Sequence, residues 1–453
     1  MSINTSQLPT GTLVLLEPQF RTKLSDKIWS NVERVARMAS FEGALARAQS
    51  NVGLISRSSA DAIASICGGK FAKAEAIFDE AIRAGNPAIP FINHLTEIVA
   101  TKHREAAADV HFGSTSQDLI DTANMIALVQ VAERLEEDLE QIVSDLHRLS
   151  VLYAETPILA RTLLQPATPI TFGLKAAIWG LALKRNRKRV QTLQQTELAI
   201  QLGGSNGALP ALSPHGNVIR ADMALQLRLA NPDHCWHTLR DRILTIAATL
   251  AGTIGATAKI AGDCLLMMQA EVGELQEGQP GTSTSMPQKK NPVHALIPVA
   301  ALPIAAAQIS AITAAQLHPH ERAPGQWHSE WISLPLLSTL ALVSVERLKE
   351  MLRHLDVNSS RMRLNVSNTN GSLGSEELVQ SLRGILGRSK AHSLVKTLSY
   401  QTDEKTFAER ILCDRTLRKL IPKKTLRNIL DYKRPLAASV TEARRLSNQL
   451  MDP

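Results

Sequence analysis

The sequence predicts an all-α protein in which an elongated central bundle of about five long helices is flanked by two smaller helical domains. The composition is 44% hydrophobic but only 4% aromatic, and cores of Leu, Ala, Ile and Val favour helices over β-sandwiches. Apolar residues recur at helical spacing, and two long stretches carry almost no charge. At 453 residues the chain can bury a large core and divide into two or three domains.

The N-terminal part, residues 1–110, is predicted to be a domain of short amphipathic helices. Between about Lys27 and His103, apolar residues lie three or four positions apart. Examples are Trp29, Val32, Val35 and Met38. The turn-like sequence Ala-Gly-Asn-Pro at 84–87 interrupts this pattern.

The central bundle, residues 111–356, is predicted from five long periodic segments. A second helix is expected over about Phe172 to Leu202, ending at Gly203-Gly204. The third begins near Asp241, the fourth begins near Pro292, and the fifth spans about Leu334 to Leu355. The first of the five segments has the clearest pattern, with apolar residues three or four positions apart, as on a helix face that packs in a bundle. These residues are Leu128, Val131, Leu135, Leu139, Ile142, Leu146 and Leu149.

Residues 357–453 are predicted to form a C-terminal helical domain, because the sequence after Asp356 becomes turn-rich and then basic. From Arg415 to Arg434 it has eight Lys or Arg and one Asp. Such a run is typical of a nucleic-acid patch or of a solvated helical face. Because no aromatic platform is interleaved, we expect a solvated face and no nucleic-acid partner.

Two nearly uncharged stretches indicate extensive burial. Pro292 to Leu317 contains no Asp, Glu, Lys or Arg, and Ile243 to Met268 is interrupted only by Lys259 and Asp263. The first is rich in Ala and includes Gln, Ser and His, whereas a lipid-facing span favours Leu, Ile and Phe, so we expect no membrane span. A helix that is apolar on all sides is buried by other helices. Two of them in one chain predict oligomerisation.

The cysteines and the N-terminus predict a cytoplasmic protein. Met1 to Thr12 is polar and lacks the apolar region of a secretory signal. Four cysteines are scattered without a CxxC pair, which is typical of buried thiols in a reducing compartment and not of a disulfide frame or zinc site. They are Cys67, Cys235, Cys264 and Cys413.

Charge and polar patterning predict a site for an anion. Lys and Arg number 50 and Asp and Glu 42, a formal charge of +8, which suits a polycarboxylate or a nucleic acid. Polar clusters at the ends of bundle helices are where such a protein assembles a site. Four polar segments interrupt the bundle, at residues 111–118, 161–169, 282–291 and 318–331.

The third of these segments has the most specific sequence. Gly281 to Pro292 reads Gly-Thr-Ser-Thr-Ser-Met-Pro-Gln-Lys-Lys-Asn-Pro. It resembles the signature loop of the fumarase/aspartase superfamily, Gly-Ser-Ser-x-Met-Pro-x-Lys-x-Asn, and departs from it at Thr282 and Thr284. The match runs through Ser283, Met286, Pro287, Lys289 and Asn291.

The first segment is similar to a motif of the adenylosuccinate lyase branch, but the acid pair of that branch is missing. The sequence from His111 to Thr122 matches His-x-Gly-x-Thr-Ser-x-Asp-x-x-Asp-Thr almost completely. Those lyases place a proton-donating His where this chain has Leu163, and its Glu partner where this chain has Leu296. Leucine cannot donate a proton, so the resemblance argues against that lyase chemistry.

The bacterial 3-carboxy-cis,cis-muconate cycloisomerases are a branch of the superfamily that lacks this pair. The segments 236–242, 320–322 and 327–331 resemble theirs, although they usually have Trp where this chain has Leu163. The resemblance implies lactonization of a tricarboxylate diene in the protocatechuate branch of the beta-ketoadipate pathway. The nucleophile is a carboxylate of the substrate, so no metal or other cofactor is expected.

The resemblance implies a set of site residues. Ser283 is expected to carry the proton, activated by N–H groups or by Lys289. His111 is an alternative proton carrier, because its ordinary pKa lies nearer neutrality. Residues expected to bind the substrate are Thr115, Ser116, Arg161, Thr162, Gln165, Asn291, Arg322 and His328. A homotetramer with shared active sites is also implied.

Two alternatives remain open. An adenylosuccinate- or argininosuccinate-type lyase is disfavoured by Leu163 and Leu296. A non-catalytic helical scaffold, or an RNA-binding protein that uses the basic C-terminal region, is disfavoured by the four polar segments.

Overall fold

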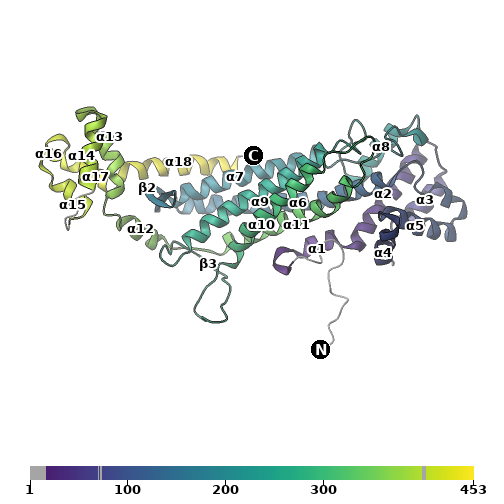
Figure 1. Ribbon diagram of the computed structural model, residues 1–453, viewed down its shortest axis with the longest axis horizontal. Helices are drawn as coiled ribbons and strands as arrows, with labels where there is room; N and C mark the ends of the chain where they lie inside the picture. Colours follow the sequence, from purple (N-terminus) through teal and green to yellow (C-terminus); the bar gives the residue numbers. More distant parts are fainter. Residues whose placement is uncertain (1–16, 70, 72–73, 400–404, 453) are drawn as a thin grey trace. The chain divides into compact units, whose positions relative to one another are not determined.

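The computed structural model describes residues 17–69, 71, 74–399 and 405–452. The polar stretch Met1 to Thr12, on which the signal-peptide expectation rests, lies outside these residues. In the described part, residues 17–110 form short helices, as the sequence predicts (Figure 1). These are the 3-10 helix η2 (Pro18–Phe20), α1 (Lys23–Ile28), α2 (Asn31–Asn51), α3 (Arg57–Cys67), α4 (Ala74–Ala84), α5 (Ala88–Lys102) and the 3-10 helix η3 (Arg104–Asp109).

Five long helices occupy the region predicted as the central bundle, which confirms the all-α fold class. They are α6 (Ser116–Leu152), α7 (Phe172–Thr192), α9 (Asp241–Met267), α10 (Val293–Ala314) and α11 (Gln326–Arg353). Shorter elements between them are β1 (Pro157–Thr162), β2 (Gln165–Thr171), the π-helix η4 (Leu193–Glu197), the 3-10 helix η5 (Pro210–Leu212), α8 (Gly216–Leu227) and β3 (Leu275–Glu277).

Short helices follow β4 (Leu355–Val357), as expected for the C-terminal part. They are α12 (Ser359–Ser367), the 3-10 helix η6 (Ser372–Gly374), α13 (Ser375–Leu386), α14 (Arg388–Ser399), α15 (Phe407–Cys413), α16 (Arg415–Leu420), α17 (Lys423–Leu430) and α18 (Lys433–Met451). The strands of the described residues form two antiparallel pairs, β1 with β2 and β3 with β4. Neither pair is predicted from the sequence.

Two helix boundaries differ from the prediction. α7 ends at Thr192 and not near Leu202, because the backbone after η4 is extended and Ile200 N–H donates to the carbonyl of Ala230 at 3.0 Å. α11 begins at Gln326, ahead of the predicted Leu334. The polar residues there resemble a loop in sequence, but Trp327 is buried and Gly325, with φ 105°, makes the turn that precedes the helix.

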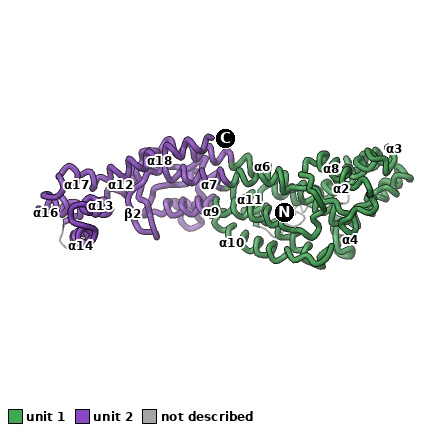
Figure 2. Tube along the Cα trace, turned by 90° about the horizontal axis from the view of Figure 1, so that it is seen from above, with its two compact units in different colours: residues 1–139, 186–258, 297–347 green, residues 140–185, 259–296, 348–453 purple. Residues whose placement is uncertain are grey.

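The chain divides into two compact units that each combine several stretches of sequence (Figure 2). Unit 1 comprises residues 1–139, 186–258 and 297–347, and its core includes Phe41, Leu45 and Leu128. Unit 2 comprises residues 140–185, 259–296 and 348–453. One cluster of its core joins helices α13 to α17 through residues such as Leu382 and Ile411. The three-domain division at residues 110 and 356 stays a prediction.

Helix α10 is less buried than the sequence predicts. In the part of the chain that the structure describes, three helices, α9, α10 and α11, are long and apolar enough to cross a membrane by length and composition alone. In the most apolar 18-residue window of each helix, the buried share is 56% for α9 and 72% for α11, but only 33% for α10. Val299 and Leu302 are among its exposed residues. Within one chain, therefore, most of the surface of α10 is not covered by other helices, and the expectation that oligomerisation buries it stays a prediction.

A buried ionic network fixes the polar segments of unit 1. The guanidinium of Arg240 contacts two carboxylates, with Nη1 donating to Asp121 Oδ2 at 2.9 Å and Nε donating to Glu330 Oε1 at 3.0 Å. Trp327 Nε1 also donates to Asp121, at 2.9 Å. Burial raises the pKa of Asp121, but the charge of Arg240 and the hydrogen bonds from Arg240 and Trp327 together outweigh this, and the net shift is downward. The network joins α6, the start of α9 and the start of α11.

We predict that Arg240→Ala lowers the free energy of unfolding by about 3–5 kcal/mol, because it leaves two buried carboxylates without their cation. Chemical denaturation followed by circular dichroism measures this. The control is Arg445→Ala, which removes an exposed arginine that pairs with Glu442 on α18 and should leave the denaturation midpoint unchanged. Equal midpoints for Arg240→Ala and wild type would show that the network does not stabilise the fold.

Candidate active site

His111 is held by a buried carboxylate that the sequence analysis did not identify. Its Nδ1 lies 2.6 Å from Oε1 of Glu42 on α2, and its backbone N–H donates to Oε2 at 3.1 Å. Ser114 Oγ lies 2.9 Å from Nδ1. Burial lowers the pKa of His111, but the charge and hydrogen bond of Glu42 outweigh this and raise it. His111 is thus a fixed imidazole whose protonated form is favoured.

The structure brings Thr115 together with Arg322, although they are far apart in sequence. Arg322 Nη1 donates to Thr115 Oγ1 at 3.1 Å, and Nη2 donates to the carbonyl of Ser205 at 3.3 Å. Thr115 therefore uses its hydroxyl as an acceptor for Arg322, while Ser116 is the first residue of α6. Arg322 is exposed, so its charge is accessible to an anion.

Asp118 is the central acceptor of this part of unit 1. The buried carboxylate accepts the N–H groups of Gly203 and Gly204 at 2.8 and 2.9 Å, and that of Thr115 at 3.1 Å. His237 Nε2 lies 2.7 Å from its Oδ1. The glycine turn at 203–207, which the sequence analysis noted as a helix terminus, is thereby tied to the polar start of α6.

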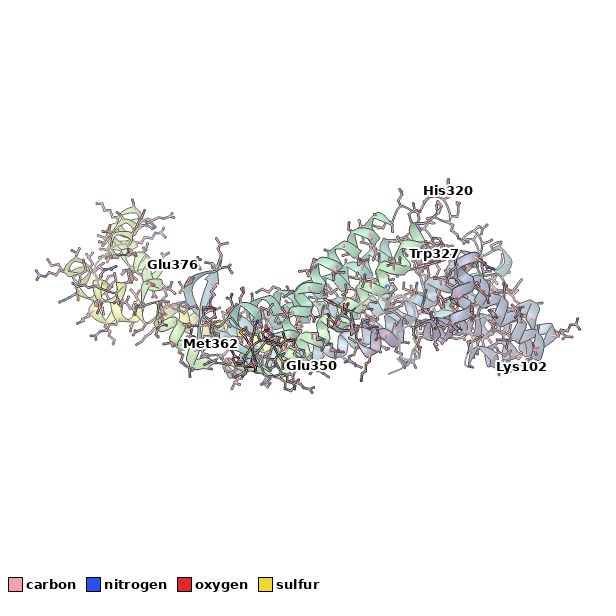
Figure 3. The ribbon with its side chains drawn as sticks, turned by 60° about the horizontal axis from the view of Figure 1, so that its bottom comes forward. Lys102, His320, Trp327, Glu350, Met362 and Glu376 are labelled. Atoms are coloured by element: carbon pink, nitrogen blue, oxygen red, sulfur yellow. The ribbon has the colours of Figure 1, made fainter. Side chains whose placement is uncertain are left out.

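His328 lies on α11 beside two tryptophans. Its ring is 5.4 Å from the Trp327 ring and 4.5 Å from the Trp331 ring, measured between centroids. The side chain is exposed. Figure 3 shows Trp327 among the helices and His320 at the tip of the segment before α11. The substrate-binding role expected of His328 stays a prediction.

In unit 2, the segment with Arg161, Thr162 and Gln165 forms the β1–β2 hairpin, with Thr162 paired to Gln165 across the turn. Nη1 and Nη2 of Arg161 donate to the two oxygens of Glu274 at 2.9 and 2.8 Å, and the Glu274 side chain is completely buried. A forked pair of this kind is rigid. A substrate carboxylate would have to share the guanidinium of Arg161 with Glu274.

The two residues at the tip of the hairpin are Leu163 and Leu164. Their φ angles are 52° and 64°, and their side chains are 97% and 70% exposed. The left-handed backbone conformation costs a non-glycine residue about 1–2 kcal/mol. The tip thus presents two apolar side chains and no group that can donate a proton from a side chain.

The loop with Ser283, Lys289 and Asn291 is closed at its base. Gly281 and Asn291 exchange two backbone hydrogen bonds, of 2.8 and 3.0 Å, and Asn291 Nδ2 donates to the carbonyl of Thr282 at 2.9 Å. Met286 N–H donates to Ser283 Oγ at 3.2 Å. Asn291 is therefore engaged in holding the loop, whereas Lys289 is exposed at its end.

Glu277, which the sequence analysis did not identify, anchors the end of this loop. It is buried at the end of β3 and accepts the N–H groups of His294 and Ala295 at 3.1 and 2.8 Å. These are N-terminal groups of α10, where a negative charge is favourable. The loop is thus an exposed segment between two fixed ends.

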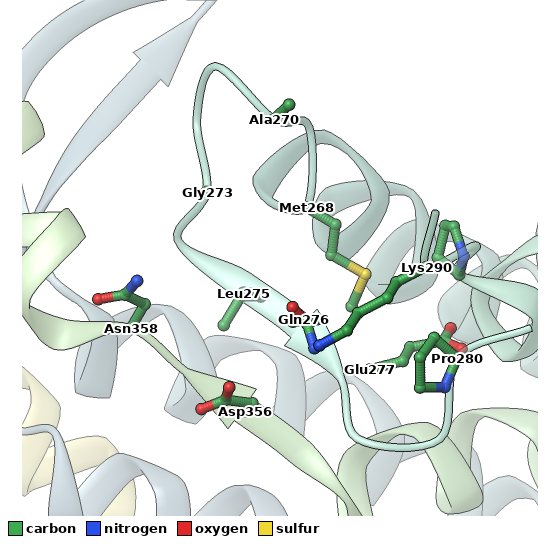
Figure 4. Close-up of a pocket in the computed structure, with 11 residues that line it drawn as sticks. Met268, Ala270, Gly273, Leu275, Gln276, Glu277, Pro280, Lys290, Asp356 and Asn358 are labelled. Carbon is green, nitrogen blue, oxygen red and sulfur yellow. The ribbon is translucent and has the colours of Figure 1, made fainter. Parts of the chain in front are cut away.

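A cavity of about 240 Å³ lies at the base of this loop. Figure 4 shows Lys290 on one side of it, with Asp356 and Asn358 on the other. Neither Ser283 nor Lys289 lines it. The cavity is therefore not the expected reaction site, although it shares the loop.

The predicted residues fall into two groups, one in each unit. His111, Thr115, Ser116, Arg322 and His328 belong to unit 1. The residues in unit 2 are Arg161, Thr162, Gln165, Ser283, Lys289 and Asn291. Among the residues that the structure describes, no group of three or more His, Cys, Asp or Glu could hold a metal ion.

Comparison with known proteins places the chain among enzymes of one family. A family model described as lyase matches residues 15–308. A 3-carboxy-cis,cis-muconate cycloisomerase of Bradyrhizobium diazoefficiens is 37% identical over 86% of this chain and 88% of its own. One of Pseudomonas aeruginosa is 36% identical, over 84% of each chain.

A solved structure agrees with these sequences. The 3-carboxy-cis,cis-muconate lactonizing enzyme from Pseudomonas putida superposes with a TM-score of 0.88 at 32% identity, over 96% of this chain and 98% of its own. The resemblance to the fumarase/aspartase superfamily, inferred from the loop and the motifs, is confirmed. On the family match and these identities, the chain belongs to the lyase family.

Proposed function

We propose that this chain is a 3-carboxy-cis,cis-muconate cycloisomerase that forms 4-carboxymuconolactone in the protocatechuate branch of the beta-ketoadipate pathway. The relatives with this name match more than four fifths of the chain. The observation that carries the proposal is the pair Leu163 and Leu296. Both are exposed leucines, and they stand at the positions where adenylosuccinate-type lyases have their acid pair of His and Glu. The loop with Ser283 is retained.

The proposed reaction needs little from the protein beyond positioning and charge. One carboxylate of the substrate attacks a carbon of the diene, so that a C–O bond forms and one C=C bond is lost. The carbon beside another carboxylate takes up a proton, which forms a C–H bond. Negative charge builds up on that carboxylate in the transition state, and donors that are already oriented lower the barrier. No leaving group is expelled.

Lys289 and Arg322 are the cations that we propose for binding the substrate carboxylates. Both are exposed, and Arg322 is oriented by Thr115 and Ser205. Arg161 is oriented by Glu274 and would bind through shared hydrogen bonds. We assign supporting contacts with the substrate to Thr115, Ser116, Thr162, Gln165, Asn291 and His328.

Ser283 is our proposed proton carrier. Its Oγ accepts the N–H of Met286, so the alkoxide form would be stabilised by a donor that is already in place. A nearby cation such as Lys289 would add to this effect. His111 is the alternative carrier, and its pairing with Glu42 favours the imidazolium, which is an acid.

We further propose that the chain forms a homotetramer in which subunits share active sites. We also propose that the protein is cytoplasmic. The support is the exposed apolar surface of α10, which includes Leu296, Val299 and Leu302, together with the exposed hairpin tip. An apolar surface of this kind marks a protein interface. All four cysteines are free, which is compatible with a reducing compartment.

The first experiment is an activity assay with purified protein, 3-carboxy-cis,cis-muconate and no added metal. We expect the ultraviolet absorbance of the diene to be lost at a turnover of about 1–10³ s⁻¹. The expected product is a lactone. Adenylosuccinate serves as the control substrate and should be left unchanged. A folded protein that does not convert the diene but releases fumarate from adenylosuccinate would overturn the proposal in favour of the lyase alternative.

Replacing Ser283 by Ala should lower kcat by about 10²–10⁴-fold, the range for loss of a general acid or base, with little change in KM. The matched control is Ser285→Ala in the same loop, which should turn over at the wild-type rate. The competing variant is His111→Gln. Near-normal turnover of Ser283→Ala together with an inactive His111→Gln would transfer the role to His111.

Light scattering at micromolar concentration should give about four times the 49.3 kDa mass of one chain. A charge on α10, Leu302→Lys, should shift this mass towards that of a single chain, because a lysine would be buried in the interface. Leu225→Lys, at an exposed leucine on α8, is the control and should leave the mass unchanged. A wild-type protein that stays at 49.3 kDa would exclude the oligomer.

A further inference from the structure

The four cysteines lie in different surroundings. Cys67 and Cys264 are buried, and burial raises the pKa of each thiol. Cys413 is exposed at the end of α15. Cys235 is half-buried in the segment before α9 and has a histidine beside it. Cys235 therefore combines access to solvent with a polar partner.

Cys235, His237 and Asp118 form a chain of contacts. Cys235 Sγ lies 4.0 Å from Nδ1 of His237, and Nε2 of the same ring lies 2.7 Å from Oδ1 of Asp118. The Asp118 side chain is completely buried and that of His237 nearly so. The carboxylate fixes the orientation of the ring, so that its other nitrogen is directed at the sulfur. This order of groups is one that activates a thiol.

The charges in this cluster favour a thiolate. Burial lowers the pKa of His237, but hydrogen bonds to Asp118 and Cys235 outweigh it and raise the pKa to about 9. The ring is therefore an imidazolium at neutral pH. The hydrogen bond from His237 is the largest cause of a lowered pKa for the Cys235 thiol. The thiolate is the reactive form of cysteine.

The sulfur packs directly against the glycine turn at 203–207. A Cβ atom at Gly203 would lie 2.9 Å from Cys235 Sγ, and one at Gly207 would lie 3.0 Å from it. There is no space on this side for an additional atom on the sulfur. The same turn presents the carbonyl of Ser205 to Arg322 and the N–H groups of Gly203 and Gly204 to Asp118.

We propose that the Cys235–His237–Asp118 cluster is a nucleophilic thiol site that reacts with small electrophiles, peroxide in particular, and thereby displaces the 203–207 turn. The thiolate attacks one oxygen of hydrogen peroxide, so that an S–O bond forms and the O–O bond breaks. Sulfur is oxidised to the sulfenic acid, and the peroxide is reduced. The leaving hydroxide takes the imidazolium proton and departs as water, and the transferred hydroxyl stays on the sulfur as the sulfenic acid.

The consequence of the modification follows from the packing. An oxygen on the side of Sγ that faces the turn has to move the backbone of the turn, and with it the Ser205 carbonyl that orients Arg322. We therefore expect the oxidised protein to bind an anionic substrate less well. This consequence rests on the proposed function, whereas the reactivity of Cys235 does not.

Alkylation of the folded wild-type protein at pH 7 by a small amount of iodoacetamide tests the reactivity. Peptide mass spectrometry should find Cys235 alkylated at least about tenfold faster than the exposed Cys413, because the thiolate is the attacking species. His237→Gln should remove this preference. If that variant does not fold, the comparison of the two cysteines in the wild type decides. Equal rates, or a faster Cys413, would overturn the proposal.

Peroxide treatment tests the displaced turn. Dimedone should trap a sulfenic acid at Cys235, and the activity towards 3-carboxy-cis,cis-muconate should fall in parallel with that adduct. Cys235→Ser should have normal activity before treatment and keep it afterwards, while Cys413→Ser should lose it as the wild type does. Full activity with Cys235 completely oxidised would overturn the effect on the turn. Mass spectrometry detects the dimedone adduct whether or not the protein is active, so the oxidation of Cys235 is tested separately from the proposed function.

Discussion

The polar segments of unit 1 depend on two buried carboxylates, Asp118 and Asp121, which lie three residues apart at the start of α6. A carboxylate buried without partners costs several kcal/mol, so each of these must be matched by donors from other segments. Asp121 is matched by Arg240 and Trp327. Asp118 is matched by His237 and the glycine turn. The need to satisfy these two charges joins three distant segments of the chain to the start of α6.

Unit 2 uses the same arrangement around β3. Glu274 and Glu277 are also buried carboxylates three residues apart. Glu274 holds Arg161 of the hairpin, and Glu277 holds the first N–H groups of α10. Between these anchors, the chain can present an exposed loop with Ser283 in a defined position. In both units, therefore, buried acids position the polar groups.

Several features of the candidate site could be predicted from sequence alone. The loop from Gly281 to Pro292 and the motif from His111 to Thr122 carry local patterns that identify the family, because their chemistry needs particular residue types at particular spacing. The loss of the acid pair is also local, since Leu163 and Leu296 can be read directly. The periodicity of α6 predicts a long helix because one face of it must be apolar along its whole length.

Other features depend on contacts between residues that are far apart in sequence. Glu42 and His111 are separated by 69 positions, and Arg161 and Glu274 by 113, so no local pattern predicts either pair. The β1–β2 hairpin was missed because its turn contains two leucines in a conformation that normally favours Gly or Asn. The fold class and the family were determined by the sequence itself, through helical periodicity and local motifs. The partners of each buried charge were decided only by the tertiary structure, because charge pairing depends on distance in space and not along the chain.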